Sequence, residues 1–125
     1  MVIKMPSITN FKRVNRVGDL IKTEISDILL KDVRDLRIRH VTITDVKMTD
    51  DLRLARIFFV PLGEVTCSDE IMEGLRNASK FFRRELGKRL RLRYVPGITF
   101  IYDKSFEYGD RIDRLLAKIE GKENR

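Results

Sequence analysis

The stretch that decides the fold reads LRNASKFFRRELGKRLRLRYVP over residues 75–96. Its apolar residues recur every three or four positions, which is the spacing of one face of an α-helix. They are Leu75, Ala78, Phe82 and Leu86. Pro96 ends the stretch, because proline has no amide hydrogen and disfavours a helical residue before it. The pattern predicts an amphipathic helix with one side on a core and the other toward solvent or a partner.

The same stretch is strongly basic. Residues 76–93 contain eight cations and a single acid, Glu85, so eight minus one gives +7, which equals the formal charge of the whole chain. The cations are Arg76, Lys80, Arg83, Arg84, Lys88, Arg89, Arg91 and Arg93. A run of charge is usually a solvated helix face, but such a face normally interleaves acids, because like charges one turn apart repel. Because this repulsion lowers the stability of the helix, it indicates a polyanionic partner that supplies the counter-charge. The six arginines favour bidentate phosphate contacts, as in RNA.

Three further features near this surface have two interpretations each. Phe81 either stacks on a base or makes a second core contact. Gly87 either lets a phosphate backbone approach closely or belongs to a fraying helix end. A second basic run either extends the positive surface or forms a solvated helix start. It consists of Lys4, Lys12, Arg13 and Arg16.

Two more helices flank this region. Residues 10–31 carry apolar residues on one face, and Thr9 or Asn10 is expected to cap the start. That face consists of Val14, Val17, Ile21, Ile25 and Ile28. The central helix is expected to begin after Ser68, where acids follow a capping residue. A last helix is expected over residues 110–121, with Ile112, Leu115, Leu116 and Ile119 on its apolar side.

Strand patterns occupy the remaining segments. Residues 41–48 alternate between apolar and polar side chains, and a slip at Thr44 and Asp45 predicts a β-bulge. Residues 55–59 form a second strand close behind, so the two should make an antiparallel hairpin. Residues 98–102 form a short third strand. The fold class is therefore α+β, a three-stranded sheet with helices on one face, in one domain over residues 1–121 with a flexible tail at 122–125.

Several function classes lack their usual residues. His40 is the only histidine and Cys67 the only cysteine, so we expect no metal site, no cofactor and no cysteine nucleophile. The acids Asp50 and Asp51 fall in a predicted turn, which argues against an enzyme. No apolar stretch has the length of a signal peptide core or a membrane span, so we expect a cytoplasmic protein.

With this element order, the sequence resembles the ribosome-binding factor A family over nearly its full length. The resemblance rests on residues 17–29, 41–46 and 51–55, and most specifically on residues 75–96. Residues 100–105 and 109–112 also match. Together these segments are far more specific than any one short motif.

The resemblance implies a KH-like fold of type II, in which a helix bend at Ala78 replaces the usual GXXG loop. Lys80 stands where the family often has glycine, two residues after that bend. The resemblance further implies a monomeric assembly factor that binds the immature small (30S) ribosomal subunit and its rRNA. Its expected role is late maturation and 5′-end processing of 16S rRNA, above all in the cold.

Two other readings of the residues stay open. A general basic nucleic-acid-binding module could use residues 83–93 as a recognition helix on DNA or RNA, and a competition between the two at matched salt separates them. A protein-interaction module would instead keep binding its target after nuclease treatment.

Overall fold

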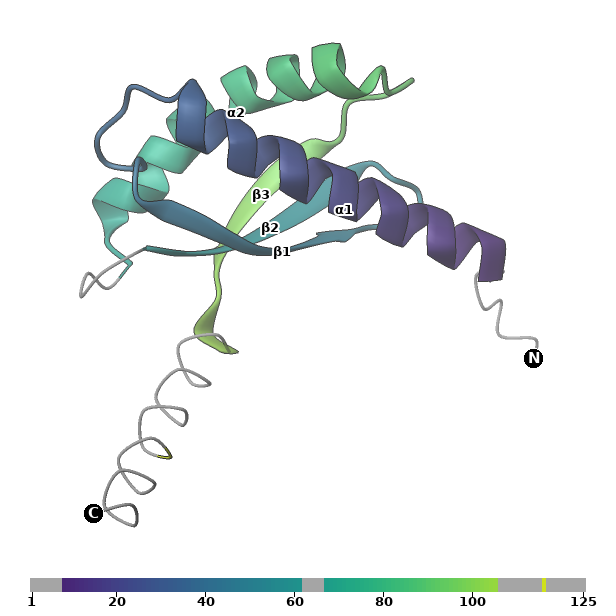
Figure 1. The fold of residues 1–125 in the computed structure, drawn as a ribbon, viewed down its shortest axis with the longest axis horizontal. Coiled ribbons are helices and arrows are strands. Elements are labelled where there is room, and N and C mark those ends of the chain that lie inside the picture. Colours follow the sequence, from purple (N-terminus) through teal and green to yellow (C-terminus); the bar gives the residue numbers. More distant parts are fainter. Residues whose placement is uncertain (1–7, 62–66, 106–115, 117–125) are drawn as a thin grey trace.

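The computed structural model describes residues 8–61, 67–105 and 116. Five elements follow one another along the chain, as Figure 1 shows. They are α1 (Ile8–Lys31), β1 (Val41–Met48), β2 (Leu54–Pro61), α2 (Asp69–Leu90) and β3 (Gly97–Tyr102). No helix of the described residues has the length and apolar character needed to cross a bilayer.

The three strands form one mixed sheet in the order β1-β2-β3. The predicted hairpin is confirmed, because β1 and β2 pair antiparallel, and the predicted bulge is confirmed by a register shift between Ile43 and Asp45. At the bulge, the Thr44 hydroxyl donates to the Asp103 carboxylate just beyond β3. β3 pairs parallel with β2, so the chain must cross the sheet between them, and α2 makes that crossing.

Both helices cover the same face of the sheet (Figure 1), and the core lies between the two layers. The predicted apolar faces are confirmed. Ile21, Ile25 and Ile28 of α1 are fully buried, and so are Leu75, Phe82 and Leu86 of α2. Phe59 of β2 is fully buried between them. Ala78 is half-buried and packs against this core.

The helix ends agree with the sequence in one case and differ in another. Ser68 caps α2 as predicted, with its hydroxyl oxygen accepting from the Ile71 amide at 3.3 Å. Thr9 and Asn10 were expected to cap α1 but lie inside it, because the helix already includes Ile8. α2 is one unbroken helix through Ala78, so no loop interrupts it there. The bend itself stays a prediction.

The expected last helix at 110–121, the domain boundary at 121 and the tail at 122–125 fall almost wholly outside the described residues. The exception is Leu116, which is helical and 52% exposed.

Candidate nucleic-acid interface

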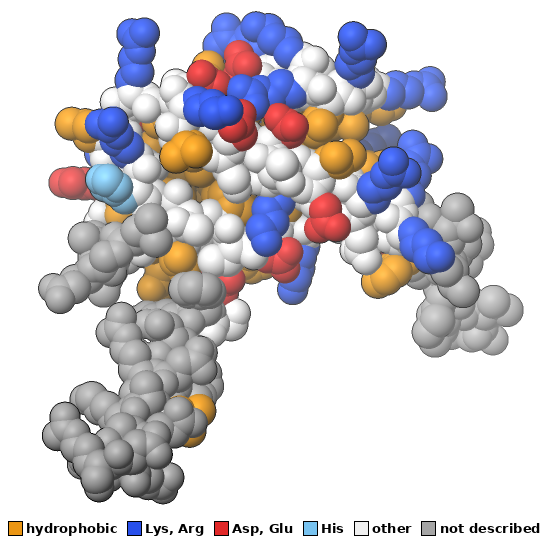
Figure 2. Space-filling model, in the orientation of Figure 1, with side chains coloured by type: hydrophobic (Ala, Val, Ile, Leu, Met, Phe, Trp, Pro, Cys, Tyr) orange, Lys and Arg blue, Asp and Glu red, His pale blue; other side chains and the backbone are white. Residues whose placement is uncertain are grey.

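Four cations form a row along the solvent side of α2. They are Arg76, Lys80, Arg84 and Lys88, all exposed, and we call them the α2 row. Residues four apart advance about 40° around a helix and about 6 Å along it, so the row winds through roughly 120° from Arg76 to Lys88, within the solvent-facing half of the helix. That side is opposite the buried Leu75 and Phe82. Figure 2 shows Lys and Arg side chains projecting from the upper edge of the molecule, where Figure 1 places α2.

Three members of the α2 row have no ion pair with any described residue: Arg76, Lys80 and Arg84. Lys88 lies 3.7 Å from a Glu85 oxygen, with 68% of its side chain exposed. An exposed pair of this kind contributes little, because water screens it. All four cations are therefore available to an external anion.

Arg89 is also basic but sits in a different environment. Its Nη1 lies 3.1 Å from Glu24 and 2.8 Å from Asp27, and its Nη2 lies 2.9 Å from Asp32. Glu85 approaches its Nε at 3.9 Å. The first two carboxylates belong to α1 and Asp32 follows directly after it, so Arg89 ties α1 to α2. We call this group the Arg89 cluster.

The cluster shifts the pKa values of Arg89 and Asp27 in opposite directions. Hydrogen bonds that the guanidinium donates to Asp27 and then to Glu24 raise the pKa of Arg89. Hydrogen bonds from Lys31 and then Arg89 lower the pKa of Asp27. Each partner stabilises the charged form of the other. The guanidinium, expected to face RNA, is occupied by carboxylates instead.

Arg83 also has an internal role. Its Nε donates to the Pro96 carbonyl at 3.1 Å and its Nη2 to the Val95 carbonyl at 3.3 Å. Both carbonyls belong to the segment between α2 and β3, residues 91–96, which we call the α2–β3 loop. A Cβ on Gly87 would lie 3.0 Å from Val95 Cγ2. The space at Gly87 is thus filled by this loop rather than open to a phosphate backbone.

The last two predicted cations, Arg91 and Arg93, lie in the α2–β3 loop and are exposed. Arg91 ends α2 in a left-handed conformation, with φ 48° and ψ 41°. The Arg93 guanidinium carbon lies 5.6 Å from the ring centroid of Tyr94. Tyr94 is 72% exposed and was not singled out by the sequence. Its position among these arginines was the available signal.

Phe81 follows the core interpretation. It is half-buried, packs against the core and has its ring centroid 6.2 Å from that of Phe82. The exposed aromatic beside the basic surface is therefore Tyr94 rather than Phe81.

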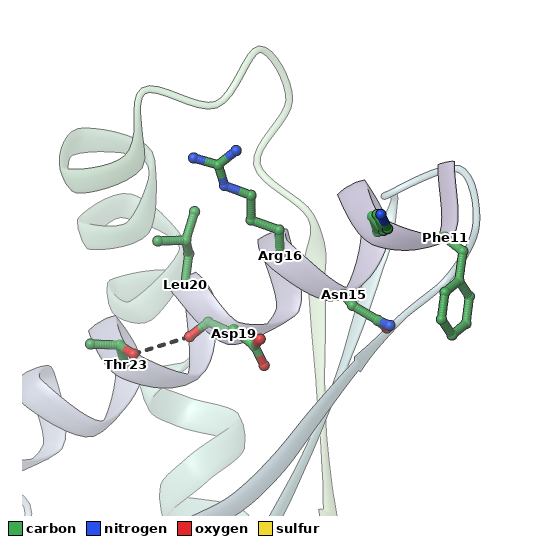
Figure 3. A pocket seen from close by; sticks show the side chains of 7 residues that line it. Phe11, Asn15, Arg16, Asp19, Leu20 and Thr23 are labelled. Carbon is green, nitrogen blue, oxygen red and sulfur yellow. Dashed lines mark hydrogen bonds between the residues drawn. The ribbon is translucent and has the colours of Figure 1, made fainter. Parts of the chain in front are cut away.

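The second basic run lies at the start of α1. Lys12, Arg13 and Arg16 are exposed, and Lys4 lies outside the described residues. Beside them is an open hollow of about 630 Å³, shown in Figure 3. Its lining consists of Phe11, Lys12, Asn15, Arg16, Asp19, Leu20 and Thr23. All come from α1, so this is the outer surface of one helix, without the converging groups of a small-molecule site.

Metal and thiol chemistry find little support in the described part of the chain. No group of three or more His, Cys, Asp or Glu side chains among residues 8–61, 67–105 and 116 could hold a metal ion. Burial, followed by the nearby charge of Asp69, raises the pKa of the Cys67 thiol. A raised pKa leaves less thiolate at neutral pH, so the thiol is a poor nucleophile.

A sequence model described as "Ribosome-binding factor A" matches residues 13–116. The chain belongs to the ribosome-binding factor A family. It is 56% identical over 116 residues to ribosome-binding factor A of Syntrophus aciditrophicus, covering 93% of this chain and 94% of that protein. The family member from Syntrophobacter fumaroxidans is 46% identical over 115 residues, covering 90% and 98%.

Solved structures of ribosome-binding factor A share the fold. The crystal structure of the Thermus thermophilus protein superposes with a TM-score of 0.63 at 17% identity, covering 71% of this chain and 94% of that one. A homology model of the same bacterium's factor, fitted into a cryo-EM map of a complex with the 30S subunit, gives a TM-score of 0.60 at 16% identity, covering 70% and 92%. The KH-like fold expected from the resemblance is confirmed.

Proposed function

We propose that this chain is a ribosome assembly factor that binds the immature small ribosomal subunit through RNA. In this role it assists late maturation of 16S rRNA, including processing of its 5′ end. It acts in the cytoplasm as a monomer and by binding rather than by catalysis. Membership of the ribosome-binding factor A family supports the role, as does the Thermus thermophilus relative fitted into a complex with the 30S subunit.

The observation that carries the proposal for this chain is the α2 row. Arg76, Lys80 and Arg84 are exposed, and none of the described residues supplies an ion-pair partner for their charges. Phosphates supply the missing counter-charge, and their bound counterions are released on binding. A row on one side of a rigid helix can follow one strand of RNA backbone. Such contacts set the position of the protein on the subunit.

The proposal is tested by reversing three charges of the α2 row, Arg76, Lys80 and Arg84, to Glu. A matched control reverses Arg34, Arg39 and Arg53, three exposed cations in the α1–β1 connection and the β1–β2 turn. Both variants change the net charge equally, so only the place of the charge differs. We expect the row variant to lose co-sedimentation with precursor 30S particles, while the control variant binds like the parent protein.

Two further measurements define the partner. Co-sedimentation with precursor, mature and translating particles should be strongest for the precursor particles. Competition between RNA and DNA of the same length and at the same salt concentration should favour RNA. Binding of precursor particles by a folded row variant would remove α2 from the interface. Equal competition by DNA would favour the general nucleic-acid-binding module.

A further inference from the structure

The α2–β3 loop presents an exposed aromatic ring among cations. Tyr94 is 72% exposed, and the Arg93 guanidinium lies 5.6 Å from its ring centroid. Arg91 and Arg93, which precede it in the sequence by three residues and one residue, are also exposed. An aromatic side chain gains much by burial, so an exposed ring that lies beside exposed arginines is a candidate contact for a partner. The surrounding positive charge favours an anionic one.

The loop is held in one shape from beneath. Arg83 donates to the carbonyls of Val95 and Pro96, and Val95 fills the space over Gly87. Pro96 is fully buried. The Gly97 amide then donates to the Arg53 carbonyl at 2.8 Å, where β3 begins. Tyr94 therefore sits on a fixed support, and binding there does not first have to order the loop.

Arg91 adds a second sign of function. Its backbone is left-handed, with φ 48°, a conformation that costs a residue with a Cβ about 1 kcal/mol and that glycine adopts freely. Helices commonly end on glycine for this reason. An arginine at this point places a cation at the end of the α2 row, at a cost in backbone strain. Strain of this kind is concentrated at functional sites.

We infer that the α2–β3 loop is a binding site for one unpaired RNA base, which stacks on the ring of Tyr94. Arg91 and Arg93 contact phosphates next to that base, and Arg83 is a positioning residue that acts through the loop. The inference rests on the proposed function and deepens it, because it names single-stranded RNA as the ligand at this end of the interface. Bases in a duplex are stacked on one another and do not offer a free face.

The first test measures binding of an oligouridine of about ten nucleotides, a length within the range that single-strand-binding sites cover. Tyr94→Ala should weaken binding about 5- to 150-fold, the loss that removal of one stacked base gives. Tyr94→Phe should bind within about twofold of the parent, because the ring is kept. Tyr94→Leu keeps an apolar side chain without a ring and should behave like Tyr94→Ala.

The salt dependence separates stacking from charge. Tyr94→Ala should leave the slope of log affinity against log salt unchanged, whereas Arg93→Gln should flatten it by about 0.7, the value for one phosphate contact on a single strand. Parental binding by Tyr94→Ala, or equal loss with Tyr94→Phe, overturns the inference. Weaker subunit binding with unchanged oligouridine binding also overturns it, because the ring would then contact a protein.

A second test uses the absence of tryptophan from the chain. Tyr94→Trp makes a single-tryptophan protein whose fluorescence should be quenched by oligouridine but not by the same strand annealed to oligoadenosine. Leu36→Trp is the control, because Leu36 is 74% exposed in the α1–β1 connection. Its fluorescence should not change with either ligand. Equal quenching of both variants, or quenching of Tyr94→Trp by the duplex, contradicts a stacking site.

Failure here is distinguishable from failure of the proposed function. If reversal of the α2 row abolishes binding to precursor 30S particles while Tyr94→Ala binds oligouridine like the parent, only the stacking site is wrong. If the folded row variant still binds these particles, the interface proposed for α2 is wrong whatever Tyr94 does.

Discussion

Arg84 and Arg89 are five residues apart on α2 and face opposite environments. Arg84 is exposed and has no ion pair with any described residue. Arg89 is 25% exposed and lies within 3.1 Å of three carboxylates from α1 and the residue that follows it. Five residues turn a helix by about 140°, which is enough to move a side chain from the solvent side to the packed side. Of two identical side chains, one is therefore exposed without an ion pair to a described residue, and the other is bonded within the fold.

The comparison shows that the number of cations in the sequence overestimates the number that are available to a partner. Of the eight cations predicted to bind RNA, Arg83 is bonded to the α2–β3 loop and Arg89 to the Arg89 cluster, so six are without such bonds among the described residues. The counter-charge that is scarce within residues 76–93 is supplied to Arg89 mainly by two acids of α1 and by Asp32. Counting acids within one helix cannot detect a neighbour that supplies them.

The largest effect on stability is expected for a substitution that removes the charge of Arg89. Arg89→Met keeps a long side chain but leaves the carboxylates of Glu24, Asp27, Asp32 and Glu85 without a shared cation. Like charges at such distances repel. The midpoint of thermal unfolding should fall clearly, and more than for any other single replacement of a cation on α2. The matched change Arg84→Met should leave the midpoint nearly unchanged, because surface positions usually tolerate substitution.

Lowering the pH should narrow the difference in the midpoint of thermal unfolding between Arg89→Met and the parent protein. The pKa of Asp27 is lowered in the folded protein, so its contribution to stability is present above its ordinary value of 3.8 and is lost as the pH falls below that. Protonation removes the attraction in the parent and the repulsion in the variant. Added salt should also narrow the difference, because it screens both the attraction and the repulsion. A gap that stays constant from pH 7 to about pH 3 would mean that packing, not charge, holds Arg89.

A smaller effect is expected at Arg83. Arg83→Lys keeps the charge but loses the fork that donates to two carbonyls, so the free energy of unfolding should fall by about 0.5–1.5 kcal/mol for each hydrogen bond lost. Arg84→Lys should be neutral. Denaturant unfolding measures both, and hydrogen exchange should show faster exchange of the amides of residues 91–95 and of Gly97 in Arg83→Lys alone. Identical stability of the two variants would mean that the loop holds its shape without Arg83.

Much of the fold could be predicted because the core imposes periodic patterns. Val14, Ile21 and Ile25 predicted the buried side of α1, and the slip at Thr44 predicted the bulge in β1. The parallel pairing of β3 with β2 was not predicted, since alternation identifies a strand but not its partner or direction. The start of α1 was placed too late, because capping residues such as Asn10 are also tolerated inside helices.

The site was less predictable, because contacts between distant segments leave little trace in local sequence. The place of Arg89 had a signal: it follows Phe82 by seven residues, about two helical turns, and so shares its side of α2. The role of Arg83 had none, since its partners are backbone carbonyls 12 and 13 residues away. The exposure of Tyr94 depends on the shape of a loop that these bonds fix.

The smallest effect on stability is expected at Arg91, where stability and binding should change independently. Arg91→Gly relieves a left-handed conformation that costs roughly 1 kcal/mol, but it also makes the unfolded chain more flexible, which takes back about 0.4–1 kcal/mol. The free energy of unfolding should therefore stay the same or rise slightly. Affinity for oligouridine should fall, and the salt slope should flatten by about 0.7, because one phosphate contact is lost.

The control for this prediction is Arg91→Lys, which keeps both the charge and the Cβ and so should match the parent in stability and in salt slope. Denaturant unfolding and oligouridine titration at several salt concentrations provide the two measurements. Clear destabilisation by Arg91→Gly would place Arg91 with Arg83 and Arg89, as a cation that serves the fold. Unchanged binding would remove it from the interface. A variant that is at least as stable yet binds more weakly would show that strain at the end of α2 is the cost of holding a cation where RNA needs it.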